Sequence, residues 1–126
     1  MWGVKKMSKE ILITDDAKFM RTMLARIVKE HGYKVAGMAE DGEEAIELYK
    51  ELEPDLVSMD ITMPGMGGIE ATKEIIEYDP DARIVVCSAM GQKPMVLEAI
   101  EAGAKDFIVK PIKPEKVKET LDKLLE

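Results

Sequence analysis

The chain has 126 residues, of which 25 are acidic and 18 basic, so its formal net charge is -7. No Lys/Arg cluster is long enough to offset this charge along a phosphate backbone, so we expect no direct binding to DNA or RNA. The longest apolar runs have the length of a strand, far below the roughly 18 residues that a membrane span needs, and the N-terminus lacks the apolar core of a signal peptide. We therefore expect neither nucleic acid nor a membrane among its partners.

Cysteine usage indicates a reducing compartment. The single cysteine, Cys87, follows the apolar residues Ile84–Val86, which is typical of a small apolar residue inside a strand. It has no second cysteine with which to form a disulfide. A chain of this length fits one domain that buries roughly two thirds of the surface of the unfolded chain. We therefore expect a cytoplasmic protein with one core.

Strand-like and helix-like patterns alternate along the chain. Residues 1–8 show neither period, and we interpret them as a loose tail before a domain at 9–126. Strands are predicted over Glu10–Thr14, Lys34–Met38, Leu56–Met59, Arg83–Ser88 and Asp106–Val109. Helices are predicted over Ala17–Glu30, Ile69–Tyr78, Pro94–Ala102 and Pro114–Leu125. A further helix is predicted to open at Asp41-Gly42 and to carry Ala45, Ile46 and Tyr49. The first helix is expected to bury a stripe made of Phe19, Met20, Met23, Leu24, Ile27 and Val28.

Five strand–helix units predict an α/β fold, in which one parallel sheet carries helices on both faces. Spacing alone does not settle the order of the strands. The small size of the chain, and the acidic residues that follow the first and third strands, favour the flavodoxin-like order 2-1-3-4-5. A ligand site is then expected where the order reverses, between strands one and three.

Three carboxylates follow two of the predicted strands. Asp15 and Asp16 come directly after the first strand, and Asp60 comes after the third. Parallel strands place their carboxyl ends at one edge of the sheet, so we expect these acids to lie close together and to repel each other. A hard cation such as Mg²⁺ relieves that repulsion and allows a phosphoryl group to approach. The acids therefore predict a phosphoryl-transfer site that binds Mg²⁺.

Two further residues belong to the same edge. Ser88 ends the fourth predicted strand and Lys110 follows the fifth, so both are expected to point into the crevice with the acids. An ammonium group can hold one phosphoryl oxygen and a hydroxyl can donate to another. The chemistry expected of this set is attack by the Asp60 carboxylate on a phosphorus atom, with Lys110 and Mg²⁺ stabilising the transition state.

The complete set of motifs is far more specific than any one of them. It consists of Asp15-Asp16, Asp60, Met63-Pro64-Gly65-Met66, Ser88-Ala89 and Lys110-Pro111. This set resembles the receiver domain of two-component response regulators, over roughly residues 10–125. Because the chain ends after the fifth predicted helix, without an output domain, it is most similar to the stand-alone chemotaxis receivers.

The resemblance implies a role for each site residue. Asp60 would accept a phosphoryl group from a CheA-like histidine kinase. Mg²⁺ would be bound by Asp16, Asp60 and the backbone carbonyl of Thr62, with Asp15 acting largely through a coordinated water. The phosphoryl group would be held by Lys110, Ser88 and the backbone of Ala89.

The resemblance also implies partners and a class of function. The output partner would be a flagellar-motor switch component or an adaptor protein, and a phosphatase is a further candidate partner. We expect a monomeric signalling protein that assists its own phosphorylation and dephosphorylation, and not an enzyme with a separate substrate.

Several positions depart from the commonest form of the family. They are expected to affect the lifetime of the phosphorylated form and the surface that a partner recognises. Thr62 replaces a frequent Asn and Met90 is apolar, and both are expected to flank the path of the hydrolytic water. Phe107 stands where a Tyr switch residue often sits. Movement of Ser88 toward the phosphoryl group is expected to let Phe107 turn inward. The partner face is then expected to consist of Val96, Ile100, Phe107 and Val109.

Other functions remain open at this point. Small phosphohydrolases with an aspartyl nucleophile carry a D-x-D pattern, which Asp60-Ile61-Thr62 lacks. A chain of 126 residues also leaves no room for the substrate cap of such an enzyme. An electron-transfer flavodoxin would hold its flavin phosphate in a Ser/Thr/Gly-rich first loop, where this chain has Asp15-Asp16. A phosphorelay intermediate and a receiver excised from a longer regulator are the alternatives within the family.

Overall fold

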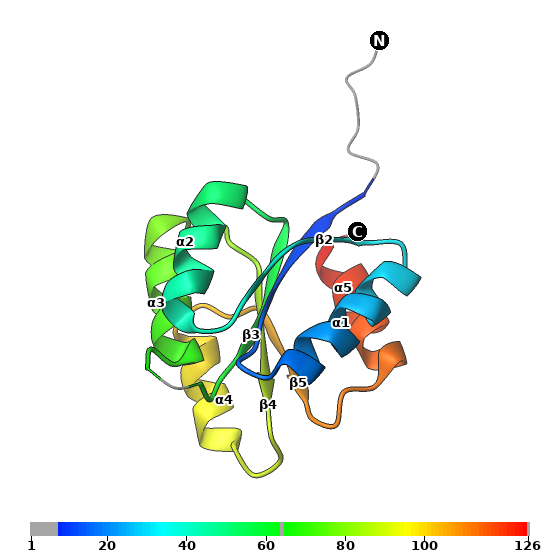
Figure 1. The fold of residues 1–126 in the computed structure, drawn as a ribbon. Coiled ribbons are helices and arrows are strands. Elements are labelled where there is room, and N and C mark those ends of the chain that lie inside the picture. Colours follow the sequence, from blue (N-terminus) through cyan, green and yellow to red (C-terminus); the bar gives the residue numbers. More distant parts are fainter. Residues whose placement is uncertain (1–7, 64, 126) are drawn as a thin grey trace.

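The computed structural model describes residues 8–63 and 65–125, and strands alternate with helices along them (Figure 1). The strands are β1 (Glu10–Thr14), β2 (Lys34–Ala39), β3 (Leu56–Asp60), β4 (Ile84–Ser88) and β5 (Asp106–Val109). The helices are α1 (Lys18–Glu30), α2 (Gly42–Leu52), α3 (Gly68–Tyr78), α4 (Lys93–Glu101) and α5 (Pro114–Leu125). Apart from Ser8, the predicted tail lies outside the described residues. Where the predicted bounds differ from those observed, they differ by one residue.

The strands form one parallel sheet in the order β2-β1-β3-β4-β5, which confirms the predicted flavodoxin-like order. β1 lies between β2 and β3, so the chain first adds β2 on one side of β1 and then crosses back to add β3 on the other side. The crevice at the carboxyl ends of β1 and β3 is therefore the switch point at which open α/β sheets bind ligands. β5 is an edge strand with one neighbour, β4.

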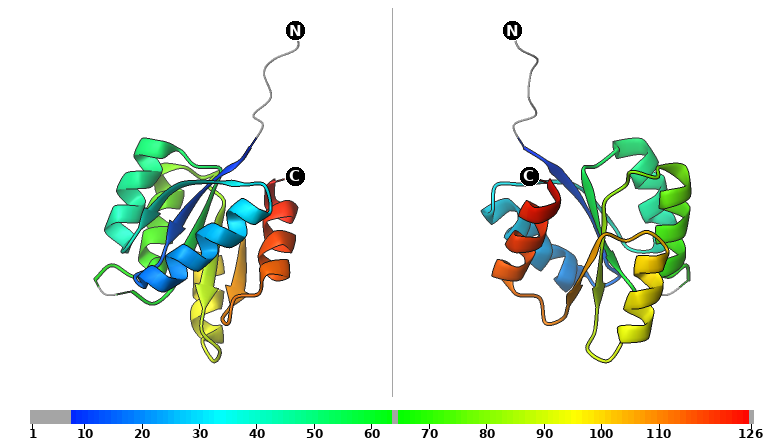
Figure 2. Two further views of the ribbon diagram at one scale, coloured as in Figure 1. Left: turned by 45° about the vertical axis from the view of Figure 1, so that its right-hand side comes forward. Right: turned by 180° about the vertical axis from the view of Figure 1, so that it is seen from behind.

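Helices cover both faces of the sheet, with α2, α3 and α4 on one face and α1 and α5 on the other (Figures 1 and 2). Side-chain alternation along the strands supplies both cores. In β1, Ile11 and Ile13 pack toward α1 and α5, whereas Leu12 packs toward α2 and α3. In β4, the Cys87 side chain belongs to the α1 and α5 side, where its thiol is buried. The expectation that this cysteine is a core residue is confirmed.

One part of the predicted stripe on α1 is wrong. Leu24, Ile27 and Val28 are buried as expected, and Met20 and Met23 pack against the core, but Phe19 is 76% exposed. Phe19 precedes Leu24 by five residues, which at about 100° per residue places it on nearly the opposite side of the helix. Phe19 is one turn from Met23, but the buried side of α1 is centred on Leu24, Ala25 and Val28 and does not reach it.

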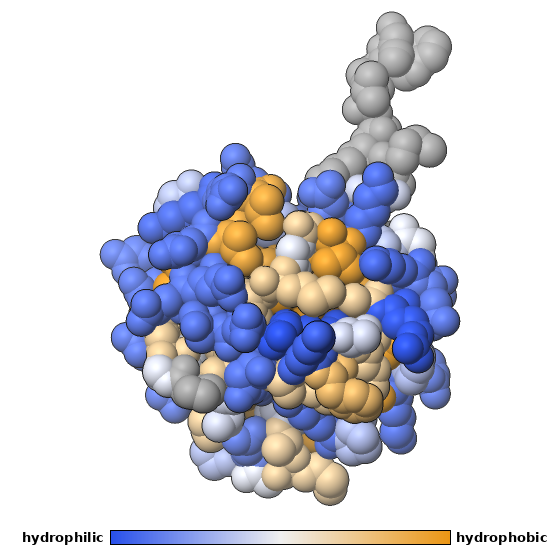
Figure 3. All heavy atoms as spheres, viewed as in Figure 1, coloured by the Kyte–Doolittle hydropathy of each residue, from blue (hydrophilic) through white to orange (hydrophobic). Residues whose placement is uncertain are grey.

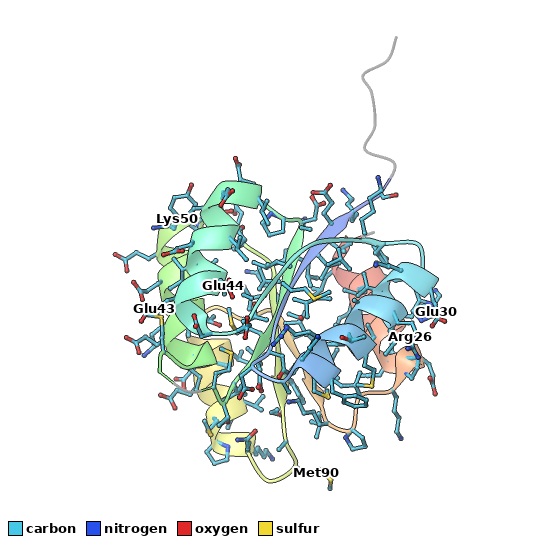
Figure 4. All side chains as sticks on the ribbon, viewed as in Figure 1. Arg26, Glu30, Glu43, Glu44, Lys50 and Met90 are labelled. Atoms are coloured by element: carbon cyan, nitrogen blue, oxygen red, sulfur yellow. The ribbon has the colours of Figure 1, made fainter. Side chains whose placement is uncertain are left out.

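The outer surface of α2 is charged. Hydrophilic residues cover this part of the molecule (Figure 3), and Glu43 and Lys50 project from α2 into solvent (Figure 4), whereas Glu44 accepts from the backbone N–H of Glu40. The helix begins at Asp41, whose side chain accepts a hydrogen bond from the backbone N–H of Glu44. This surface therefore has an ordinary role in solvation and helix capping. Among the described helices, none is long and apolar enough to cross a membrane.

Candidate functional site

Strand alternation brings the predicted acids to one corner of the sheet. Asp15 lies two residues beyond Ile13 in β1, and Asp60 lies two residues beyond Ser58 in β3, so both side chains point to the α1 and α5 side. Asp15 and Asp60 are buried, whereas Asp16 is exposed at the mouth of the site. Ligand oxygens of all three acids lie within 4.8 Å of one another. The structure therefore assembles the predicted carboxylate cluster.

Lys110 contacts both buried acids. Its Nζ lies 3.4 Å from Oδ2 of Asp15 and 3.5 Å from Oδ1 of Asp60. The lysine follows β5, and its backbone N–H donates to the carbonyl of Ser88 at the end of β4 (2.7 Å), which fixes the base of the side chain. The predicted meeting of Lys110 with the acids is confirmed, although the lysine comes from an edge strand and reaches across β4.

The site is electrostatically strained. Burial raises the pKa of Asp60 and the nearby charge of Asp15 raises it further; Lys110 and the backbone N–H of Thr62 oppose these effects, and the resulting pKa is about 6. Burial lowers the pKa of Lys110, but Asp60 and Asp15 outweigh this, so its pKa lies above the usual value. One ammonium group thus serves two buried carboxylates and leaves an excess of negative charge.

The donor set fits a small divalent cation. It consists of carboxylate oxygens, which are hard ligands of the type that Mg²⁺ prefers, and their mutual repulsion is relieved by added positive charge. Asp15 is already partly engaged, since its Oδ1 accepts a hydrogen bond from the backbone N–H of Ala17 (2.9 Å). Asp60 likewise accepts from Lys110 and from the N–H of Thr62, so an ion would share its oxygens with these donors, whereas Asp16 is exposed at the mouth of the site.

The backbone that carries Asp60 is held on both sides. The N–H of Ile61 donates to the carbonyl of Cys87 in β4 (3.0 Å), and the N–H of Gly68 donates to the carbonyl of Ile61 (3.0 Å). A Cβ at Gly68 would lie 2.1 Å from the carbonyl oxygen of Asp60, so no other residue fits there without moving the strand. The first turn of α3 therefore packs directly on the residue that carries the central carboxylate.

The loop after β4 contains a contact that sequence reasoning missed. Ser88 is buried at the strand end, and the next backbone N–H, that of Ala89, donates to Oε1 of Gln92 (2.7 Å). The Nε2 of Gln92 donates in turn to Oγ1 of Thr62 on the loop after β3 (2.9 Å). The available signal was a polar residue at the N-cap position of α4, immediately after Gly91.

The predicted switch and partner residues gather around an apolar cavity of about 350 Å³ between α4 and β5. Phe107, Val109 and Ser88 line it from the sheet. Val96 is only 6% exposed, so it forms part of the wall and offers little outer surface. Ile100 is exposed on α4 but does not line the cavity.

Two exposed apolar residues beside this cavity were not predicted for the partner face. Leu97 lines it from α4, and Met90 lines it from the loop and projects away from the ribbon at the tip (Figure 4). A helix presents neighbouring residues to different sides, so Leu97 is 56% exposed although Val96 beside it is buried. The ring of Phe107 is 41% exposed in this structure.

A second charged contact lies at the opposite end of β5. Nζ of Lys123 in α5 lies 2.6 Å from Oδ2 of Asp106, the first residue of β5. Burial raises the pKa of Asp106, but the hydrogen bond and charge of Lys123 outweigh this and hold the pKa below its ordinary value. This pair is therefore satisfied, unlike the cluster at Asp60.

Known families match this chain over nearly all of its length. The family model described as response regulator receiver domain matches residues 11–122. The chemotaxis protein CheY of Thermotoga maritima is 63% identical over 118 residues, which cover 94% of this chain and 98% of that protein. The chemotaxis protein CheY of Bacillus subtilis is 56% identical over 119 residues, covering 94% and 99% respectively. These relatives do not favour the phosphohydrolase, flavodoxin, phosphorelay or excised-receiver alternatives.

Solved structures agree with this assignment. A CheX–CheY–BeF₃–Mg complex from Borrelia burgdorferi contains a chain with a TM-score of 0.88 and 37% identity, over 94% of this chain and 90% of that one. The response regulator domain of Thermotoga maritima CheB has a TM-score of 0.82 and 39% identity, over 93% of each chain. Receiver domains bind Mg²⁺ in their acidic pocket, and the cluster of Asp15, Asp16 and Asp60 lies at that place. The chain therefore belongs to the response regulator receiver domain family and is a CheY-like chemotaxis regulator.

Proposed function

We propose that Asp60 is the phosphoacceptor of this regulator, and that its phosphorylation by a CheA-like histidine kinase is the input signal. The observation that supports this assignment is the pair of contacts from Lys110, which reaches both buried acids while Asp16 stays exposed. Of the two buried carboxylates, Asp15 accepts a backbone hydrogen bond that ties one of its oxygens to its own loop. Asp60 also accepts a backbone hydrogen bond, from Thr62, but it pairs with Cys87 in β4 and is therefore the buried carboxylate on the strand next to Ser88 and Ala89.

The chain's own groups prepare the transfer. In its ionised form, a carboxylate oxygen of Asp60 attacks the phosphorus of phosphohistidine, the P–N bond breaks, and its electron pair stays on the imidazole nitrogen. Lys110, fixed beside Oδ1 of Asp60, holds a transferred phosphoryl oxygen by charge, while Ser88 and the N–H of Ala89 donate to the others. Asp15, Asp16, Asp60 and the carbonyl of Thr62 would hold Mg²⁺, which neutralises the charge that gathers on the phosphoryl oxygens.

The expected output is a change of the surface around the apolar cavity. Ser88 pairs with Val109 and Phe107 pairs with Val86, so the site and the exposed ring belong to adjacent strands. When Ser88 moves toward the phosphoryl group, space opens on the side of the sheet that carries Phe107, and the ring can turn inward. Val96, Ile100, Phe107 and Val109 then present a different face to a partner.

The partners follow from this role. The proposed output partner is a flagellar-motor switch component or an adaptor protein, and the structure of a CheX–CheY complex supports a phosphatase as a further partner. We propose that the protein acts as a monomer in the cytoplasm, consistent with its buried free thiol at Cys87, and that it binds neither nucleic acid nor membranes. It functions as a signalling switch and not as an enzyme with a separate substrate; its domain spans residues 9–126.

Phosphorylation by acetyl phosphate tests the assignment of Asp60. With Mg²⁺ present, the parent protein is expected to gain one hydroxylamine-labile phosphate by mass spectrometry, and Asp60→Asn is expected to gain none. Asp81→Asn changes an exposed acid at the other end of the sheet and serves as the matched control. If Asp60→Asn takes up as much phosphate as the control, another residue is the acceptor.

Beryllofluoride with Mg²⁺ tests the proposed output by NMR. The amide shifts of Val96, Ile100, Phe107 and Val109 are expected to change together with those beside Asp60. If the changes stop at the residues around Asp60, phosphorylation and the cavity are not coupled.

A further inference from the structure

Gln92 links two loops of the site and leaves its own helix uncapped. It occupies the N-cap position of α4, yet its side chain makes no capping hydrogen bond to that helix. Its carboxamide instead accepts from the N–H of Ala89 and donates to Oγ1 of Thr62, at 2.7 and 2.9 Å. One side chain therefore joins the loop after β4 to the loop after β3, the strand that carries Asp60.

These two hydrogen bonds conflict with phosphoryl binding. In the proposed function, the N–H of Ala89 donates to a phosphoryl oxygen, but in this structure Oε1 of Gln92 already accepts that hydrogen. A backbone N–H makes one well-aligned hydrogen bond, so the two acceptors compete. The phosphoryl oxygen is charged, and a charge-assisted hydrogen bond is roughly twice as strong as one to a neutral amide oxygen. Phosphorylation is therefore able to displace Gln92.

We propose that Gln92 is a positioning residue that holds the unphosphorylated site closed and that leaves the Ala89 N–H when Asp60 is phosphorylated. This inference rests on the proposed function, because it uses the assignment of Ala89 as a phosphoryl ligand. Thr62 is exposed, so after displacement its hydroxyl bonds to water at little cost. The two hydrogen bonds of Gln92 thus stabilise the unphosphorylated state, and the phosphoryl group breaks them when it binds the Ala89 N–H.

Displacement of Gln92 also reaches the partner face. Gln92 lines the apolar cavity together with Val96 and Phe107. The preceding Gly91 has a φ of +86°, a conformation that favours glycine, and it sets the angle at which the loop enters α4. A released Gln92 changes the mouth of the cavity and frees the N-terminus of α4 from Thr62. The residue therefore connects the phosphoryl site to the surface that the partner reads.

Beryllofluoride binding measures the competition directly. Calorimetric titration in the presence of Mg²⁺ is made on the parent and on Gln92→Met, in which a side chain of similar length and volume can neither accept from Ala89 nor donate to Thr62. Loss of these two net hydrogen bonds is expected to lower the half-saturating beryllofluoride concentration at least about 5-fold. Glu98→Gln, on the exposed side of α4, is the matched control and is expected to titrate like the parent.

The amide signal of Ala89 provides a readout that a general loss of packing does not move. In the unloaded parent this N–H is hydrogen-bonded, so in unloaded Gln92→Met its proton shift is expected to move upfield and its exchange to become faster. After loading, the Ala89 shifts of the two proteins are expected to converge, because the same fluoride then accepts from both. Thr62→Val is expected to change the beryllofluoride titration less in the Gln92→Met background than in the parent.

Failure of the inference and failure of the proposed function are distinguishable. If the parent binds beryllofluoride but Gln92→Met binds it no more tightly and keeps its Ala89 shift, Gln92 does not hold the site closed, and the proposed function stands. If the parent itself binds no beryllofluoride, the proposed function is wrong, and the role of Gln92 is wrong with it.

Discussion

The two ends of β5 carry opposite kinds of charge contact. At the start of the strand, Lys123 and Asp106 form a one-to-one pair at 2.6 Å. Just beyond its end, Lys110 lies 3.4 and 3.5 Å from two buried acids, Asp15 and Asp60, and matches neither closely. The first contact lowers the pKa of its acid, whereas burial and Asp15 raise the pKa of Asp60 to about 6. The two ends of one strand therefore carry a pair that favours the folded state and a cluster that opposes it until a cation binds.

The largest expected effect comes from removing the acid at the strained end. The folded pKa of Asp60, about 6, lies above its ordinary value of 3.8, so the stability linked to this group is full below pH 3.8 and is lost as pH rises through 6. Asp60→Asn, measured without Mg²⁺, is expected to raise the free energy of unfolding at pH 7.5 by about 2 to 3 kcal/mol. Urea titrations at several pH values check this.

The pH dependence of that gain identifies its cause. The stabilisation is expected to shrink as the pH falls from 7.5 toward 4, because Asp60 becomes protonated in the folded parent and then in the unfolded chain. A gain of equal size at both pH values would mean that better packing, and not the removed charge, stabilises the variant.

Removing the positive charge of Lys110 is expected to have the next largest effect. Lys110→Met keeps the apolar stem but leaves Asp15 and Asp60 facing each other, so the free energy of unfolding at pH 7.5 is expected to fall by about 2 kcal/mol. This figure is below that for a fully buried pair because the Lys110 side chain is 27% exposed. Lys113→Met, exposed in the same loop, is the control. If both lysine variants unfold at the same urea concentration, Lys110 does not offset the acids.

Adding a cation is expected to remove the strain from the other direction. Binding of Mg²⁺ to the folded state alone raises the free energy of unfolding by about 1.4 kcal/mol at ten times the Kd. The melting temperature by calorimetry is expected to rise with Mg²⁺ in the parent and to rise much less in Asp16→Ala, while exposed Asp81→Ala behaves like the parent. Equal rises in all three proteins would place the ion elsewhere.

The smallest expected effect is at the satisfied end of β5. Asp106→Asn loses the ion pair with Lys123, and exposed ion pairs of this kind add little to stability. Because the pKa of Asp106 is lowered, its contribution is present above its ordinary pKa and is lost as pH falls, opposite in sign to that of Asp60. In urea titrations, the free energy of unfolding of Asp106→Asn is expected to lie slightly below that of the parent, and this difference is expected to become smaller in 0.5 M salt. A larger loss than in Lys110→Met would contradict the comparison.

Most of the fold and the centre of the site could be predicted because both depend on short-range rules. A period of two along the strands places Asp15, Asp60 and Lys110 on one side of the sheet. Gly and Pro at the ends of predicted helices gave bounds within one residue of those observed. The strand order was favoured by the position of the acids and is confirmed by the structure.

The missed features depend on contacts between segments that are distant in sequence. Gln92 and Thr62 are 30 residues apart, and the polar residue at the N-cap position of α4 does not by itself indicate which group it contacts. The close approach of Gly68 to the carbonyl of Asp60 was not predicted either. Phe19 and Leu97 are large apolar residues on helices, and residue type alone did not reveal that they face solvent.

The end of β4 is hydrogen-bonded in two directions through consecutive residues. The carbonyl of Cys87 accepts from the N–H of Ile61, which follows β3. The carbonyl of Ser88 accepts from the N–H of Lys110, which follows the edge strand β5. A movement of these last residues of β4 lengthens both hydrogen bonds at the same moment. The amide hydrogens of Ile61 and Lys110 are therefore expected to share one opening event and to show the same protection from exchange with solvent, although one follows a central strand and the other follows the edge strand.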